Sequence, residues 1–142
     1  MSAKEDVGAL LLALVDRVSH RGGETLSLMS EAGLTLPQVL FLTRLRQAGG
    51  STASELAERF NMSLPATSQM VDRLFKQGLL TRAEDEGDRR RKRLAVTPSA
   101  ERLLDRLVRA RATEYMKGIA RLSPALQREL AAVLAKAVSE LS

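Results

Sequence analysis

The residues of this chain that are best suited to chemistry form an unbroken run of cations. Arg89, Arg90, Arg91, Lys92 and Arg93 follow one another directly after an acidic turn. Guanidinium groups pair with phosphate oxygens, and arginine is favoured where the minor groove of DNA is narrow and negative. We expect Arg90 to reach toward a minor groove, with Arg89 and Arg91 nearby. The alternative interpretation is a solvated charge run that only aids solubility.

Composition narrows the classes of function. The chain has 142 residues, with 22 Lys and Arg against 17 Asp and Glu, and a formal net charge of +5. This balance favours a polyanionic partner, with nucleic acid first. The chain has no cysteine and one histidine, His20, and it lacks a Gly-rich phosphate loop and any spaced cluster of metal ligands. We therefore expect no catalytic residues, no metal site and no cofactor.

The N-terminal segment also bears on location. The apolar run from Val7 to Val15 is short and is followed by Asp16 and Arg17. This pattern fits neither a signal peptide nor a membrane span, so we expect a cytoplasmic protein without a membrane partner.

Hydrophobic spacing predicts a mainly α-helical chain. A first helix covers residues 7–18, and a weaker helical pattern continues to Gly33. Thr35 opens a helix through a capping box with Gln38, and that helix stops at Gly49. Two further helices begin after 97 and 123, where a capping residue precedes proline.

Two short helices and a β-ribbon occupy the middle of the chain. A capping box at Thr52 opens a helix that stops at Asn61, and Ser63 opens the next, which continues to Gly78. Residues 79–84 and 91–97 then have an extended pattern, and the composition of residues 85–88, which follow the first segment, suits a hairpin turn. The order predicts a winged helix-turn-helix.

The helix that begins after Ser63 has an apolar and a polar side. The apolar side, expected to pack inward, carries Thr67, Met70, Val71 and Leu74. The outward side carries Pro65, Ala66, Gln69, Arg73 and Lys76. A glutamine can read adenine with two hydrogen bonds, a small alanine can contact a thymine methyl group, and Ser63 with the free N–H groups beside it suits a phosphate. We expect this face to lie in the major groove; the alternative is an ordinary solvated helix face.

The stretch ELAERFNMSLPATSQMVDRLFKQGLLTRAEDEGDRRRKRLAVT resembles the MarR family of winged-helix transcriptional regulators. The likeness lies in the ELAERF helix, the VDRL and KQGLL segments, the Asp88-Arg89-Arg90 tip and the closing Val96-Thr97 pair, and it extends loosely over the flanking helices. Ala100 departs from it, because the family usually has glycine there. The resemblance implies an ion pair between Asp72 and Arg90 that holds the wing in register, and Asp88 is a second candidate to orient the arginines.

The expected organisation is one domain, 1–142, with a winged helix-turn-helix lobe at 36–97. Residues 1–33 and 98–142 carry long apolar stripes that must be covered, and packing between two copies covers them most simply. One short helix reads only a few base pairs, so a homodimer is expected to bind double-stranded DNA at a palindromic operator.

The resemblance further implies a repressor that responds to a small-molecule effector, bound between the dimerisation helices and the DNA-binding lobe. A winged-helix architectural DNA-binding protein, or a protein-interaction module without ligand response, is the alternative. An interaction module is expected to have a neutral or acidic recognition face, and Gln69, Arg73 and the arginine run argue against such a module.

Overall fold

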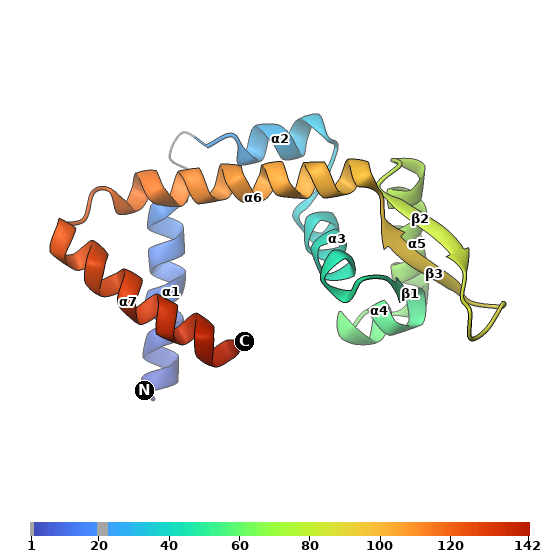
Figure 1. Ribbon diagram of the computed structural model, residues 1–142, viewed down its shortest axis with the longest axis horizontal. Helices are drawn as coiled ribbons and strands as arrows, with labels where there is room; N and C mark the ends of the chain where they lie inside the picture. Colours follow the sequence, from blue (N-terminus) through green and yellow to red (C-terminus); the bar gives the residue numbers. More distant parts are fainter. Residues whose placement is uncertain (1, 20–22) are drawn as a thin grey trace. The chain divides into compact units, whose positions relative to one another are not determined.

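The computed structural model describes residues 2–19 and 23–142, which form helices and a small antiparallel sheet (Figure 1). The elements are, in order, α1 (Ala3–Val18), α2 (Thr25–Glu31), α3 (Leu36–Ala48), β1 (Ser51–Thr52), α4 (Ala53–Arg59), α5 (Leu64–Lys76), β2 (Leu80–Glu84), β3 (Lys92–Val96), α6 (Pro98–Ile119) and α7 (Pro124–Leu141). The predicted class, mainly α with a small β element, is confirmed. His20 lies outside the described residues, within which no helix is long and apolar enough to cross a membrane.

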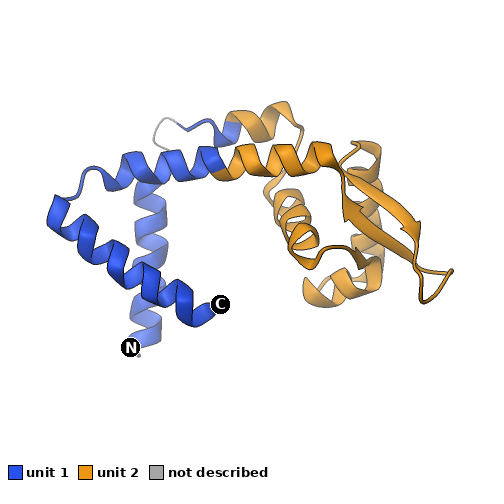
Figure 2. Ribbon diagram, viewed as in Figure 1, with its two compact units in different colours: residues 1–26, 109–142 blue, residues 27–108 orange. Residues whose placement is uncertain are grey.

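The chain divides into two compact units (Figure 2). Unit 1 comprises residues 1–26 and 109–142, and unit 2 comprises residues 27–108. In unit 1, α1 and α6 approach closely at Gly118, where an added Cβ would lie 2.6 Å from the Cα of Val18. A larger residue at Gly118 would force these two helices apart.

Unit 2 is held together by a continuous apolar core. Its most deeply buried large side chains are Phe41, Leu42, Leu45, Leu56, Leu74, Leu80, Leu94 and Leu104. They come from α3, α4, α5, α6 and both long strands, which therefore share one core, and α2 adds the buried Leu28. Ala100, the position where the MarR resemblance breaks, is fully buried near the start of α6, which makes it part of this packing.

The helices of unit 2 begin where the capping residues predict. Thr35 and Thr52 each form a complete capping box, with Gln38 and Glu55 respectively. The Ser63 hydroxyl accepts a hydrogen bond from the Ala66 backbone N–H at 3.2 Å and so caps α5. These side chains satisfy N–H groups that have no partner within the first turn of a helix.

The sheet has one strand more than the predicted two-stranded ribbon. β1 pairs antiparallel with β3, and the strand order is β1-β3-β2. Hydrophobic alternation does not reveal this strand, because β1 is only two residues long and Thr52 also caps α4. β1 anchors the inner edge of the ribbon to the start of α4.

Ion pairs join α3 to α6 within unit 2. The Nη1 of Arg46 lies 2.8 Å from Oδ1 of Asp105 and 3.5 Å from Oε2 of Glu101. Because Arg46 is about three-quarters covered and meets two carboxylates, its side chain is part of the scaffold and is not free for other partners.

The charge of Glu55 links β1 to α4 and makes this junction sensitive to pH. Its pKa lies below the ordinary value of 4.5, first because the Ser51 hydroxyl donates to its carboxylate at 2.6 Å and then because the Thr52 backbone N–H donates at 3.1 Å. A carboxyl group whose pKa falls on folding stabilises the fold above its unfolded pKa, and this stabilisation is lost as the pH falls through the lowered value.

Glu55→Gln is therefore expected to lower the free energy of unfolding at neutral pH. The difference from the unchanged protein should shrink below about pH 4.5, the range in which Glu55 itself becomes protonated. Urea unfolding at several pH values measures it, with Glu58→Gln on the same helix as the matched control. If the free energy of unfolding of Glu55→Gln differs from that of the unchanged protein by the same amount down to pH 3, the charge of Glu55 does not stabilise the junction of β1 and α4.

Candidate nucleic-acid interface

Helix α5 divides its surface into three stripes, because successive residues turn by about 100° around its axis. The buried stripe contains Thr67, Val71 and Leu74, with Met70 half-buried at its border. A second stripe, formed by Leu64, Ser68 and Asp72, lines a hollow that faces the hairpin. The third stripe is open and consists of Pro65, Ala66, Gln69, Arg73 and Lys76, all exposed. The sequence-predicted recognition residues thus lie together on the free side of the helix.

Both ends of α5 are fixed by side chains. At its start, the exposed Ser63 caps the first turn, and the Thr67 hydroxyl donates to the Ser63 carbonyl at 2.9 Å. At its end, the Gln77 amide donates to the Gly33 carbonyl at 3.1 Å, and the Thr97 hydroxyl donates to the Gly78 carbonyl at 2.8 Å. The open stripe is therefore presented by a rigidly held helix.

The hairpin between β2 and β3 forms the wing. Glu84 pairs with Lys92 at the end of the ladder, and residues 85–91 form its tip. The Asp88 carboxylate accepts a hydrogen bond from the Arg90 backbone N–H at 2.9 Å, which fixes the turn just before the cationic run. Arg89, Arg90 and Arg91 are all exposed at this tip. The Asp88 side chain thus acts on the backbone that carries these arginines.

The cationic run is divided between the two faces of the wing. Arg90, Arg91 and Lys92 line the hollow of about 320 Å³ that also contains the second stripe of α5. Arg93 points to the opposite face, where its guanidinium donates to the Gly50 carbonyl at 3.3 Å. Alternation along the strand causes this division and leaves Arg93 as a support of the β1 junction.

The partner expected for Asp72 is wrong. The Asp72 carboxylate forms its ion pair with Arg82 of β2, and none is formed with Arg90 in the described part of the chain. Arg82 lies in mid-strand beside α5, whereas Arg90 lies in the tip loop, where its backbone is bonded to Asp88. Asp72 still ties α5 to the wing, through a different arginine.

Arg82 is the functional residue that sequence reasoning missed. Its guanidinium also stacks on the ring of Phe75, 4.4 Å from the centroid, so it contacts two α5 side chains. A signal was present, because period-two alternation places Arg82 two residues after the buried Leu80 and therefore on the same face of β2. We name Asp72, Phe75 and Arg82 the wing clamp.

The comparisons with known proteins agree with this geometry. A family model described as the MarR family matches residues 34–92, from just before α3 to the start of β3. The transcriptional repressor MdtR of Bacillus subtilis is 31% identical over 96 residues, which cover 68% of this chain and 60% of MdtR. The crystal structure of YusO from Bacillus subtilis is 26% identical, covers 98% of this chain and 99% of YusO, and has a TM-score of 0.72. This chain belongs to the MarR family.

Membership of the MarR family makes the chain a DNA-binding transcriptional regulator of winged-helix type and not an enzyme. The fold is also shared with MepR of S. aureus, solved as a complex with DNA, at 20% identity and a TM-score of 0.66 over 99% of this chain and 98% of that one. At this identity the likeness concerns the fold alone.

The wing clamp predicts a specific pattern of stability for this MarR-family chain. Arg82→Gln removes an exposed ion pair and a cation–π contact and should lower the free energy of unfolding by about 1 kcal/mol. Asp72→Asn should lower the free energy of unfolding by less than Arg82→Gln does. The double variant should be no less stable than Arg82→Gln alone, because both changes break the same ion pair. Urea unfolding measures all three.

Arg91→Gln is the matched control for the clamp. This substitution removes an exposed cation of the wing that forms no side-chain hydrogen bond or ion pair in the described residues. The free energy of unfolding of the variant should therefore equal that of the unchanged protein. Additive losses for Asp72→Asn and Arg82→Gln would show that the two side chains act independently and would contradict the clamp.

Proposed function

We propose that this MarR-family regulator is a homodimeric repressor that binds a palindromic operator and is released by a small-molecule effector. The observation that carries the proposal is the open stripe of α5, which lies free beside a wing whose exposed arginines belong to the same compact unit. This combination supplies one surface for base edges and one for the minor groove.

Each contact residue has a proposed role. Gln69 and Arg73 read base edges in the major groove, where Ala66 contacts a thymine methyl group. Ser63, Pro65 and Lys76 border this face, and the N–H groups of the first turn of α5 bind a phosphate.

Arg90 enters the minor groove, with Arg89 and Arg91 on the flanking backbone. Asp72 and Asp88 position the wing through Arg82 and the Arg90 backbone.

The proposal that the chain is a dimer rests on apolar surface in unit 1. On α1, Val7, Leu10 and Leu12 are each more than 60% exposed, and α7 has no buried residue at all. The exposed apolar side chains of α7 include Val133, Leu134, Val138 and Leu141. Apolar surface of this extent is normally covered, and a second copy of the chain covers it symmetrically.

This assignment divides the chain by function. We assign DNA binding to residues 36–97 and dimerisation to residues 1–33 and 98–142. Two recognition helices related by a two-fold axis would read half-sites about one helical turn apart. Repression is proposed by analogy with MdtR, whose name describes a repressor. Effector response requires only that the effector bind the free and the DNA-bound states with different affinities.

Selection from a pool of random double-stranded DNA, at two salt concentrations, tests the proposal. The expected result is an enriched palindrome whose affinity falls steeply with salt, because lysines and arginines displace counterions from phosphates. Arg102→Gln, which removes an exposed arginine of α6 in unit 2, is the matched control and should select the same sequence with unchanged affinity.

Two results would contradict the proposal. Salt-sensitive binding without an enriched sequence would indicate an architectural DNA-binding protein. A half-site without its symmetric copy would show that the chain does not read DNA as a two-fold dimer.

A further inference from the structure

Lysines are few in this chain, and one of them lies among arginines. Five of the 22 Lys and Arg residues are lysines, and all five are exposed: Lys4, Lys76, Lys92, Lys117 and Lys136. An amine can attack an acyl group as a nucleophile, whereas a guanidinium group stays charged and does not. Exposure alone therefore leaves five candidate sites of acylation, and only their surroundings can distinguish them.

Lys92 lines the hollow of about 320 Å³ between α5 and the wing, which we call the wing hollow. Arg82, Arg90 and Arg91 line it as well, and the carboxylate that lines it, Asp72, is paired with Arg82. Arg90, Arg91 and Lys92 form no ion pair in the described part of the chain. The wing hollow therefore has an excess of positive charge and attracts anions.

Hydroxyl groups complete the polar lining of the wing hollow. Ser54 of α4 and Ser68 of α5 are both exposed and both line it. The oxygens of a phosphate group accept hydrogen bonds from guanidinium, ammonium and hydroxyl donors alike. The anion that best uses this set of donors is a phosphate.

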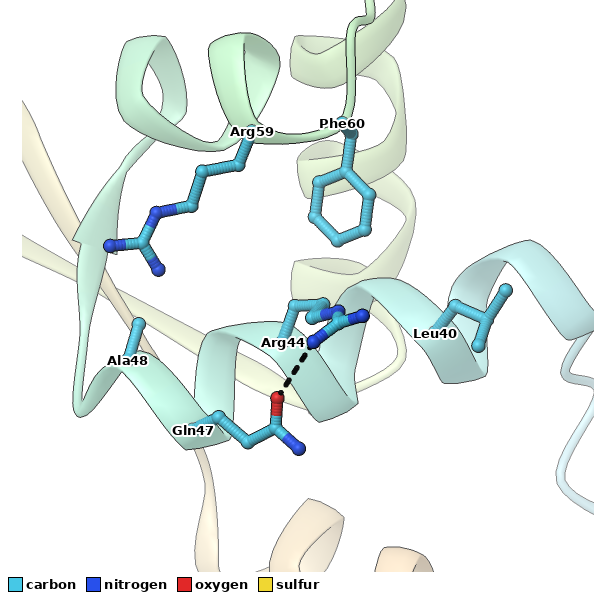
Figure 3. Close-up of a pocket in the computed structure, with 6 residues that line it drawn as sticks. All are labelled: Leu40, Arg44, Gln47, Ala48, Arg59 and Phe60. Atoms are coloured by element: carbon cyan, nitrogen blue, oxygen red, sulfur yellow. Dashed lines mark hydrogen bonds between the residues drawn. The ribbon is translucent and has the colours of Figure 1, made fainter. Parts of the chain in front are cut away.

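The hollow between α3 and α4 provides a contrast. Arg44 and Arg59 line that hollow, and no lysine does (Figure 3). An anion paired with these two arginines would meet no amine. The wing hollow differs because it places a nucleophile beside the cations that attract the anion.

We propose that Lys92 is a site of covalent acylation by small acyl phosphates, of which acetyl phosphate is the simplest. Arg90 and Arg91 pair with the phosphate end, which holds the acyl carbon beside the Lys92 amine. The unprotonated amine attacks that carbon, an amide C–N bond forms, and the C–O bond to the phosphate breaks. Inorganic phosphate leaves with the electron pair of that bond, and the amine proton passes to water. The product is a neutral amide on the wing.

Acylation of Lys92 acts on DNA binding, a consequence that rests on the function proposed above. The amide no longer has the positive charge of the amine. The wing therefore attracts DNA phosphates less strongly, whatever the base sequence. DNA in turn competes with the acyl phosphate for the same arginines. The free regulator is thus open to acylation, and the DNA-bound regulator is protected.

Treatment of the full chain with acetyl phosphate, without DNA, tests the site. Mass spectrometry after cleavage at glutamate measures acetylation, because the peptide of residues 87–101 contains Lys92 and no other lysine. Lys76, exposed on the open stripe of α5, is the internal reference. Lys92 should be acetylated about tenfold faster than Lys76, because positive potential concentrates the anionic donor. Acetic anhydride, an uncharged donor, should acetylate both lysines at similar rates.

Variants of the wing hollow test whether its arginines capture the donor. In the Arg90→Gln, Arg91→Gln double variant, the ratio of the two rates with acetyl phosphate should fall to the ratio found with acetic anhydride. The Arg102→Gln, Arg106→Gln double variant removes two exposed arginines of α6 in the same unit and is the matched control. It should leave the ratio unchanged. Circular dichroism confirms that each variant is folded.

Two outcomes overturn the site. One is equal rates for Lys92 and Lys76 with acetyl phosphate. The other is a preference for Lys92 that persists in the Arg90→Gln, Arg91→Gln double variant, which would show that the amine reacts without a captured phosphate group.

Operator binding by protein with Nε-acetyllysine installed at position 92 separates this site from the proposed function. The affinity should fall by the same factor for every DNA sequence, with a salt dependence weaker by about one counterion. Selective acetylation of Lys92 without this loss supports the site and overturns its effect on DNA binding. An unmodified chain that selects no operator contradicts the proposed function and leaves the acetylation rates as evidence for the site.

Discussion

The structure of unit 2 depends on the burial of one stripe of α5. Thr67, Val71 and Leu74 are almost completely buried, and Leu74 belongs to the same core as Leu56, Leu80 and Leu94. Burial of these side chains fixes the rotation of the helix about its axis. The directions of the other two stripes are then fixed as well: one must face the wing, and one must remain open. The position of the face that we propose reads DNA follows from that single constraint.

The wing depends on the same helix. A two-stranded hairpin alone is marginally stable, and here it is supported at both of its edges. β1 pairs with β3 on one side, while the wing clamp joins β2 to α5 on the other. Since the clamp uses the stripe of α5 next to the open one, the helix and the cationic tip are held as one surface. The charge of Glu55 belongs to this support because it secures the residues that form β1.

Local chemistry made much of this fold predictable. Capping boxes at Thr35 and Thr52, and Ser63 before α5, define helix starts through contacts within four residues, and the sequence contains all of that information. The stripes of α5 follow from its period. β1 was missed because two residues carry no alternation, and α2 was only weakly indicated because Thr25–Glu31 has a single buried residue, Leu28.

Interactions between distant segments were harder to predict. The sequence offered Asp72 several arginines. Alternation along β2 placed Arg82 on the buried face, but the structure was needed to show that Arg82 meets Asp72 while the Arg90 backbone N–H bonds to Asp88. Arg44 of α3 and Arg59 of α4 likewise line one hollow only because these two helices pack together (Figure 3).

The most direct test of the central claim is DNA sequence preference after Gln69→Ala, measured by selection against the operator of the unchanged protein. If the open stripe of α5 reads bases, preference should relax at one base pair in each half-site, with a loss there of about 1–3 kcal/mol of discrimination. Gln47→Ala, an exposed glutamine on α3, is the matched control and should retain the full preference. An unchanged preference for Gln69→Ala at every position, with unchanged affinity, would contradict the claim that this face of α5 lies in the major groove.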